Sequence, residues 1–110
     1  MKLTFERGGS MNTCSIEKAL NLFVEKWKFL IIRELLTGKK RFSELKRNID
    51  TISQKVLTQN LRQMEASGLL IRTVYPEIPP RVEYELTSLG LSLSPIIDAI
   101  RTWGDTYAKI

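Results

Sequence analysis

The hydrophobic positions in the first third of the chain predict two helices. After Ser15, a suitable N-cap, apolar side chains recur at offsets of 0, 4, 7, 8 and 11 from Ile16, which is the spacing of one helical stripe. From Trp27 to Leu36 the chain is apolar nearly all round, which is typical of a central buried helix. Gly38 is expected to end that helix.

Two more helical patterns follow, separated by a short break. The first runs from Phe42 to Ile49 and places Leu45 on the same face as both. The second starts at Ser53, again a good N-cap, and ends at Gly68. At 100° per residue, its apolar side chains point one way and its hydrogen-bonding side chains point the other. The polar face comprises Gln54, Lys55, Thr58, Gln59 and Arg62.

A hairpin pattern follows these helices. Leu70–Tyr75 and Val82–Leu86 mix β-branched, aromatic and polar residues as strands do, and three prolines stiffen the tip between them. The order predicts a mainly α fold with a small β-wing, the winged helix-turn-helix, which places one helix in the DNA major groove. Arg81 could reach a minor groove or phosphate, or could instead pair with Glu77 or Glu83.

The C-terminal region is predicted to be helical and rich in apolar surface. Thr87 would cap the helix, and Pro95 either kinks it or restarts it with Ser94 as N-cap. Such a stripe usually belongs to a core, but at a chain end outside the winged unit it is also a candidate two-fold interface. Together with the N-terminal stripe, the predicted dimer interface contains Ile16, Leu20, Phe23, Ile96, Ile100, Trp103 and Tyr107.

Composition narrows the class of protein. The chain has 110 residues, 43% of them hydrophobic and 26% charged, which fits a single globular domain. One Cys and no His exclude His-based catalytic pairs and the usual zinc sites, and carboxylates such as Glu34 and Glu44 are scattered. We therefore expect no enzyme activity, no metal and no cofactor. Without a membrane-length apolar run or a signal-peptide pattern, a cytoplasmic location is expected.

The positive charge is concentrated on the predicted helix-turn-helix. Between Lys39 and Arg62, a stretch that opens with a short basic connection, seven basic residues face two acidic ones, which equals the net charge of +5 for the whole chain. Most charge runs are only solvated faces, but this one coincides with the motif that would need phosphate contacts. The predicted DNA-binding residues are Arg41, Lys46, Ser53, Gln54, Lys55, Thr58, Gln59, Arg62 and Arg81.

The N-terminal residues hold the single cysteine. Residues 1–13 lack a clear period and are expected to form a flexible tail before a domain at 14–110, and Met11 could be the true start. A lone cysteine is most often a small buried hydrophobe. Cys14, however, precedes the first stripe, where helix amide dipoles and nearby Lys18 could activate its thiol. A thiol sensor is therefore an open alternative.

These stretches resemble the HxlR-type family of bacterial winged helix-turn-helix regulators, relatives of the MarR-like group. The most specific match is the wing, Tyr-Pro-Glu-Ile-Pro-Pro-Arg-Val-Glu-Tyr, at residues 75–84. Further matches are Lys26-Trp27, residues 41–45, residues 52–58 and Trp103-Gly104. The resemblance covers nearly everything after Cys14.

The resemblance implies a homodimer, formed by the N- and C-terminal helices, that binds a pseudo-palindromic operator in double-stranded DNA. Some such regulators respond to electrophiles or oxidants through the cysteine that aligns with Cys14. An alternative is a winged-helix module that binds protein rather than DNA. One departure concerns the turn, where Thr51 occupies a frequent Gly position. Because a β-branched residue resists positive φ, this turn is expected to take another shape.

Overall fold

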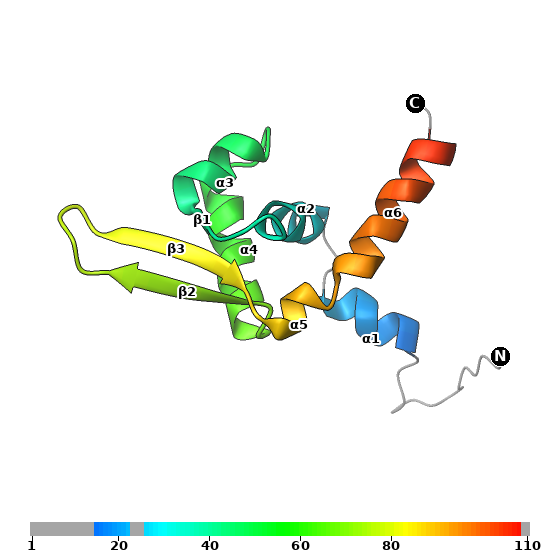
Figure 1. Ribbon diagram of the computed structural model, residues 1–110, viewed down its shortest axis with the longest axis horizontal. Helices are drawn as coiled ribbons and strands as arrows, with labels where there is room; N and C mark the ends of the chain where they lie inside the picture. The colour runs from blue at the N-terminus through cyan, green and yellow to red at the C-terminus, as the bar shows by residue number, and fades with distance from the viewer. Residues whose placement is uncertain (1–14, 23–25, 109–110) are drawn as a thin grey trace.

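The computed structural model describes residues 15–22 and 26–108, with side chains for 15–18 and 26–108 (Figure 1). The tail at 1–13, Cys14 and Phe23 lie outside the described residues. Figure 1 shows a group of helices with a long hairpin projecting from one side and the C-terminal helix from the other. The elements are α1 (Ser15–Leu22), α2 (Lys26–Leu35), β1 (Lys40–Arg41), α3 (Phe42–Asn48), α4 (Gln54–Ala66), β2 (Leu70–Tyr75), β3 (Arg81–Leu86), α5 (Ser88–Leu91) and α6 (Ser94–Tyr107).

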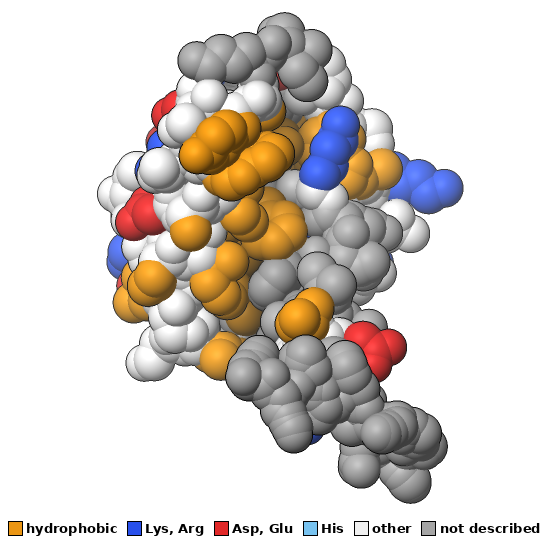
Figure 2. Space-filling view, turned by 90° about the vertical axis from the view of Figure 1, so that its right-hand side faces the viewer, with side chains coloured by type: hydrophobic (Ala, Val, Ile, Leu, Met, Phe, Trp, Pro, Cys, Tyr) orange, Lys and Arg blue, Asp and Glu red, His pale blue; other side chains and the backbone are white. Residues whose placement is uncertain are grey.

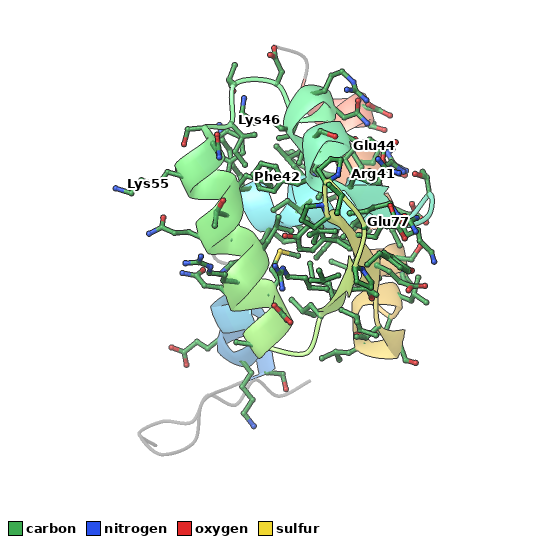
Figure 3. All side chains as sticks on the ribbon, turned by 90° about the vertical axis from the view of Figure 1, so that its left-hand side faces the viewer. Arg41, Phe42, Glu44, Lys46, Lys55 and Glu77 are labelled. Carbon is green, nitrogen blue, oxygen red and sulfur yellow. The ribbon has the colours of Figure 1, made fainter. Side chains whose placement is uncertain are left out.

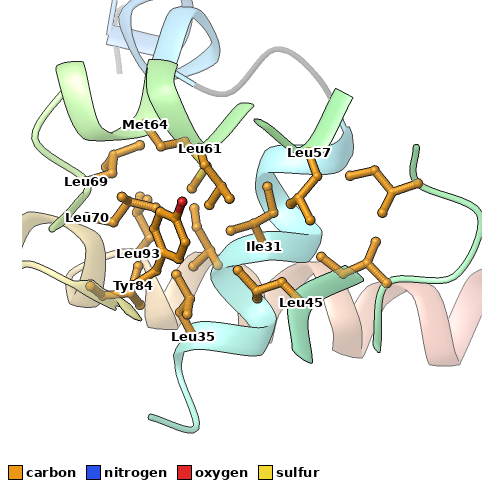
Figure 4. Close-up of a cluster of buried hydrophobic side chains, with 14 of the residues drawn as sticks. Ile31, Leu35, Leu45, Leu57, Leu61, Met64, Leu69, Leu70, Tyr84 and Leu93 are labelled. Atoms are coloured by element: carbon orange, nitrogen blue, oxygen red, sulfur yellow. The ribbon is translucent and has the colours of Figure 1, made fainter. Parts of the chain in front are cut away.

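Helix α2 forms the centre of the core, as its apolar sequence predicts. Ile31 and Ile32 have no exposed surface, and Leu35, one helical turn after Ile31, is buried on the same side of the helix (Figure 4). Around them, α2 packs against α3, α4 and strand β3. Ser15, expected as an N-cap, is instead the first residue of α1, and Gly38 has φ 132° in the turn after α2. A side chain at that φ would be strained, so glycine suits the end of this helix.

The turn between α3 and α4 corrects one expectation. Thr51 has φ 70°, so the turn does adopt a positive φ despite the β-branched residue. The flanking residues explain this outcome, because Ile49 and Ile52 are each only 1% exposed and must both enter the core. A close turn, in which the Ile52 N–H donates to the Ile49 carbonyl at 3.4 Å, makes this possible. Core packing outweighs the local preference of the residue at the bend.

The wing is a hairpin extended by a third strand. Strands β2 and β3 pair antiparallel from Leu70 opposite Leu86 to Tyr75 opposite Arg81. Strand β1 pairs with the other edge of β3, so the order is β1-β3-β2. The basic connection before α3 was expected to be a simple linker, but Lys40 belongs to this strand. The pairing fixes the start of α3 against the wing.

The C-terminal region consists of two helices, so of the two predicted alternatives the restart is confirmed and the kink is not. The Thr87 side chain accepts from the Gly90 N–H at 3.1 Å and caps α5, as expected. The chain then restarts at α6, where the N-cap is Leu93 rather than the expected Ser94 and Pro95 lies in the first turn. At Gly90 a Cβ atom would collide with the backbone oxygen of Leu69, so α5 can approach the strand closely only with glycine there. None of the described helices is long and apolar enough to cross a membrane.

Candidate DNA-binding interface

Helix α4 divides into the two faces that its sequence predicts. Leu57 and Met64 have no exposed surface and anchor the helix to the core. All five residues predicted for the polar face reach the surface, and only Thr58 is half-buried. The same five line a single surface hollow: Gln54, Lys55, Thr58, Gln59 and Arg62. Hydrogen-bonding side chains are thus gathered on one exposed helix face, which is what reading base edges requires.

The start of α4 is fixed by the predicted cap. The Ser53 side chain accepts a hydrogen bond from the Val56 N–H at 3.1 Å, so Ser53 lies just outside the helix. Figure 3 shows Lys46 of α3 and Lys55 of α4 projecting near this end of the helix. Free amide groups and the helix dipole favour negative charge at an N-terminus. The cap and the two lysines therefore form a suitable contact for phosphate.

A cavity of about 490 Å³ lies between α4 and the wing. Figure 3 shows Phe42, the first residue of α3, between α4 and the hairpin. One of the basic residues that line the cavity, Arg72 of strand β2, was not among the DNA-binding residues predicted from the sequence. The lining residues of the cavity are Phe42, Gln54, Thr58, Leu61, Arg62, Glu65, Arg72, Val82 and Tyr84.

Arg72 faces α4 because of the strand register. It pairs with Tyr84, and paired residues on neighbouring strands share a face of the sheet. Tyr84 is only 7% exposed and packs in the core, so this face is the one turned to the helices. Alternation along the strand then assigns Arg81 and Glu83 to the opposite face. The sequence does contain a signal for Arg72. It is two residues from the buried Leu70 in the same strand, so the two side chains lie on the same face of the sheet.

Four of the five basic residues between residue 39 and the start of α4 divide into two groups. Lys39 approaches Glu83 at 3.9 Å, and the Lys40 ammonium donates to Thr37 Oγ1 at 2.7 Å. Lys46 and Arg41 are exposed, and the Arg41 backbone N–H donates to the Glu44 carboxylate at 2.8 Å at the start of α3. The side chains of the second group are therefore available to phosphate. Arg41 and Lys46 therefore remain predicted contacts to DNA.

Arg81 is engaged within the wing. Its guanidinium pairs with Glu83 at 3.0 Å and with Glu77 at 2.9 Å, so both pairings left open by the sequence are formed. It also lies 4.0 Å from the centre of the Tyr75 ring. The hydrogen bond that Arg81 donates to the Glu77 carboxylate is the main reason that the pKa of Arg81 is raised. A direct contact between Arg81 and DNA remains a prediction.

Helix α6 carries the apolar residues predicted for the dimer interface on one face. Ile96, Ile100, Trp103 and Tyr107 follow helical spacing and are 42%, 51%, 61% and 68% exposed. Figure 2 shows apolar side chains gathered on this side of the molecule. Ile16 of α1 is also 70% exposed, whereas the side chain of Leu20 is not described. The described residues thus leave a continuous apolar stripe uncovered on α6.

Residues 22–110 match the HxlR-like helix-turn-helix family. The chain belongs to this family. It is 50% identical over 104 residues to an uncharacterized HTH-type transcriptional regulator of Methanothermobacter thermautotrophicus, covering 94% of this chain and 79% of that one.

Solved structures agree with this assignment. A Porphyromonas gingivalis W83 protein, described as a transcriptional regulator of the MarR family, is 42% identical with a TM-score of 0.85, over 92% of this chain and 99% of that one. The redox regulator HypR in its oxidized form is 39% identical with a TM-score of 0.83, over 88% of this chain and 100% of that one. The winged helix-turn-helix fold of this HxlR-like chain is therefore confirmed.

The HxlR-like domain also contains a buried polar residue on α4 that the sequence did not reveal. Asn60 is 2% exposed and donates through Nδ2 to the Val56 carbonyl at 2.8 Å. Its Oδ1 atom is buried without a hydrogen-bond partner among the described residues. The helix that carries the polar face therefore also holds a buried amide oxygen whose acceptor capacity is unused among the described residues.

Proposed function

We propose that this HxlR-like protein is a transcriptional regulator that binds operator DNA by placing helix α4 in the major groove. The observation that carries the proposal is the exposed polar face of α4, which stands opposite an apolar face that is packed into the core. The excess of basic residues on the same motif supplies the electrostatic attraction that DNA binding needs.

The residues of the interface divide by chemistry. Gln54 and Gln59 carry amides that can form paired hydrogen bonds to adenine in the major groove. Lys46 and Arg41 lie outside α4 and suit phosphate contacts, which set position and affinity but not sequence. Arg62 lines both the surface hollow and the cavity beside the wing, so it can serve either purpose. Lys55, Thr58 and Ser53 complete the proposed set.

The functional unit is proposed to be a homodimer. The apolar stripe of α6 would be covered by a second copy, because a symmetric pair buries the same patch on both subunits. Two recognition helices about 34–36 Å apart would then meet successive major grooves on one side of a pseudo-palindromic operator. Ile16, Leu20 and Phe23 are proposed to join this interface from the N-terminal helix.

A thiol response is proposed as the regulation of this protein. The support is its similarity to HypR, which is named a redox regulator. Cys14 is the only cysteine in the chain, so the available chemistry is a disulfide between subunits, a mixed disulfide with a small thiol, or alkylation. The site of action would be the cytoplasm, where thiols are kept reduced until an oxidant or electrophile arrives.

The test is selection of bound fragments from the host genome, followed by affinity measurements on the selected site. A variant with alanine at Gln54, Gln59 and Arg62 should lose sequence preference and most of its affinity. Gln63→Ala is the matched control, because Gln63 is exposed on the same helix but outside the polar face. Unchanged affinity in the triple variant would overturn the assignment of α4 as the recognition helix. If wild-type protein shows no salt-dependent affinity for DNA, a protein-binding module is favoured instead.

A further inference from the structure

The tip of the wing is apolar and fully exposed. Ile78 is 102% exposed, and Pro76, Pro79 and Pro80 beside it are exposed as well. Figure 1 shows that the hairpin carries this tip well away from the helices. The three prolines fix φ at their positions, and the Glu77 N–H donates to the Tyr75 carbonyl at 2.8 Å. An apolar side chain is therefore held at the end of a stiff arm.

The charges near the tip cancel one another. Arg81 binds Glu77 on one side and Glu83 on the other, at 2.9 and 3.0 Å. Its remaining nitrogen, Nε, is buried without a partner among the described residues. The guanidinium therefore has little left to offer a phosphate. Together with Lys39, whose ammonium lies 3.9 Å from the Glu83 carboxylate, it balances the two carboxylates that would otherwise repel phosphate. The tip that remains is compact, apolar and uncharged.

A single exposed isoleucine needs no explanation in general. Here, however, the usual polar residues of a hairpin tip are replaced by Pro-Glu-Ile-Pro-Pro, and the only acidic member is ion-paired. The strands of the same hairpin line the cavity beside the polar face of α4, so the hairpin that carries the tip rises next to the proposed recognition helix. An apolar tip beside a basic DNA-binding helix has a known use, which is insertion into the minor groove.

We propose that Ile78, backed by its neighbouring prolines, is an apolar wedge that enters the DNA minor groove and partly unstacks a base step. Arg81 is then a positioning residue that neutralises the tip and holds its shape. The inference rests on the proposed function, since it needs α4 in the adjacent major groove. Wedges are inserted most readily at flexible pyrimidine–purine steps, so the operator should carry TA or CA/TG steps where the wings land.

The experiment uses the operator fragment obtained by genomic selection, with 2-aminopurine at adenines outside the base pairs that α4 protects. Wild-type protein should raise the fluorescence of one such position in each half-site, because unstacking relieves quenching. Ile78→Ala should abolish that rise and weaken binding roughly fiftyfold, as expected from the loss of three buried carbons. Ile71→Ala is the matched control, since Ile71 is an exposed residue of the same hairpin near its base. It should bind and fluoresce like wild type.

Equal affinity and equal fluorescence for Ile78→Ala and wild type would overturn the wedge while leaving the proposed function intact, and would point to a protein partner for the tip. Failure of wild-type protein to bind any selected DNA would instead refute the proposed function. The role of Arg81 has its own readout. Arg81→Gln should weaken binding, and adding Glu77→Gln should restore it, with the salt dependence unchanged. A double variant whose salt slope falls by about 0.9 would show that Arg81 contacts phosphate directly.

Discussion

Replacing Thr51 by glycine should make the protein more stable. The backbone at Thr51 has φ 70°, a conformation that costs an L-residue about 1–2 kcal/mol and suits a β-branched side chain least. Glycine removes this cost. It also gives the unfolded chain more freedom, which offsets about 0.4–1 kcal/mol of the gain. Because the Thr51 side chain is exposed, few packing contacts are lost. The expected net effect is a stabilisation of about 0.5–1 kcal/mol.

Urea unfolding of wild type, Thr51→Gly and Thr51→Ala at one protein concentration measures this effect. The midpoint should rise for glycine with an unchanged m-value, and the melting temperature should rise by about 2–8 °C. The protein concentration is held constant because dimerisation would itself shift the midpoint. Thr51→Ala retains a Cβ atom, so it should gain less than glycine. An alanine variant as stable as the glycine variant, or a glycine variant less stable than wild type, would refute the explanation by positive φ.

Three further variants test other parts of the structure. Gly90→Ala should lower stability in urea by at least about 1–3 kcal/mol, because the new Cβ atom would collide with the Leu69 backbone oxygen; an unchanged midpoint would contradict this packing. Ile100→Asp should yield monomers or aggregate in light scattering, where wild type should give twice 12.7 kDa; a 12.7 kDa wild type at micromolar concentration would exclude the dimer. Diamide should release wild type but not Cys14→Ser from its operator, and equal responses would leave Cys14 as a packing residue.

The sequence predicts the fold well wherever hydrophobic period and capping agree. The limits of α4 follow from Ser53 as N-cap and from Gly68, whose φ of 79° suits glycine. The two strands of the wing follow from β-branched and aromatic residues in a short alternating run. Strand β1 could not be predicted in the same way, because two residues carry no period. It forms only because β3 offers an unpaired edge beside the start of α3.

Contacts between individual side chains were the part of the site that the sequence could not supply. The spacing of Glu77, Arg81 and Glu83 allowed ion pairs or free charges equally, and only the hairpin geometry shows that both pairs form. The prediction for the turn at Thr51 failed for a related reason. A local rule about β-branched residues was applied where two buried isoleucines on either side of the bend impose the stronger demand.

The two arginines of the wing lie on opposite faces of its sheet, and this separates their surroundings. Arg72 lies across from Tyr84, on the face that packs toward α4, and lines the cavity beside the recognition helix. Arg81 lies on the opposite face and is held by Glu77 and Glu83. A cation that is already paired on both sides adds little to phosphate binding, since part of any new attraction must replace existing bonds. We therefore expect the charge that the wing offers to DNA to be at Arg72, near its base, and its tip to make contacts of another kind.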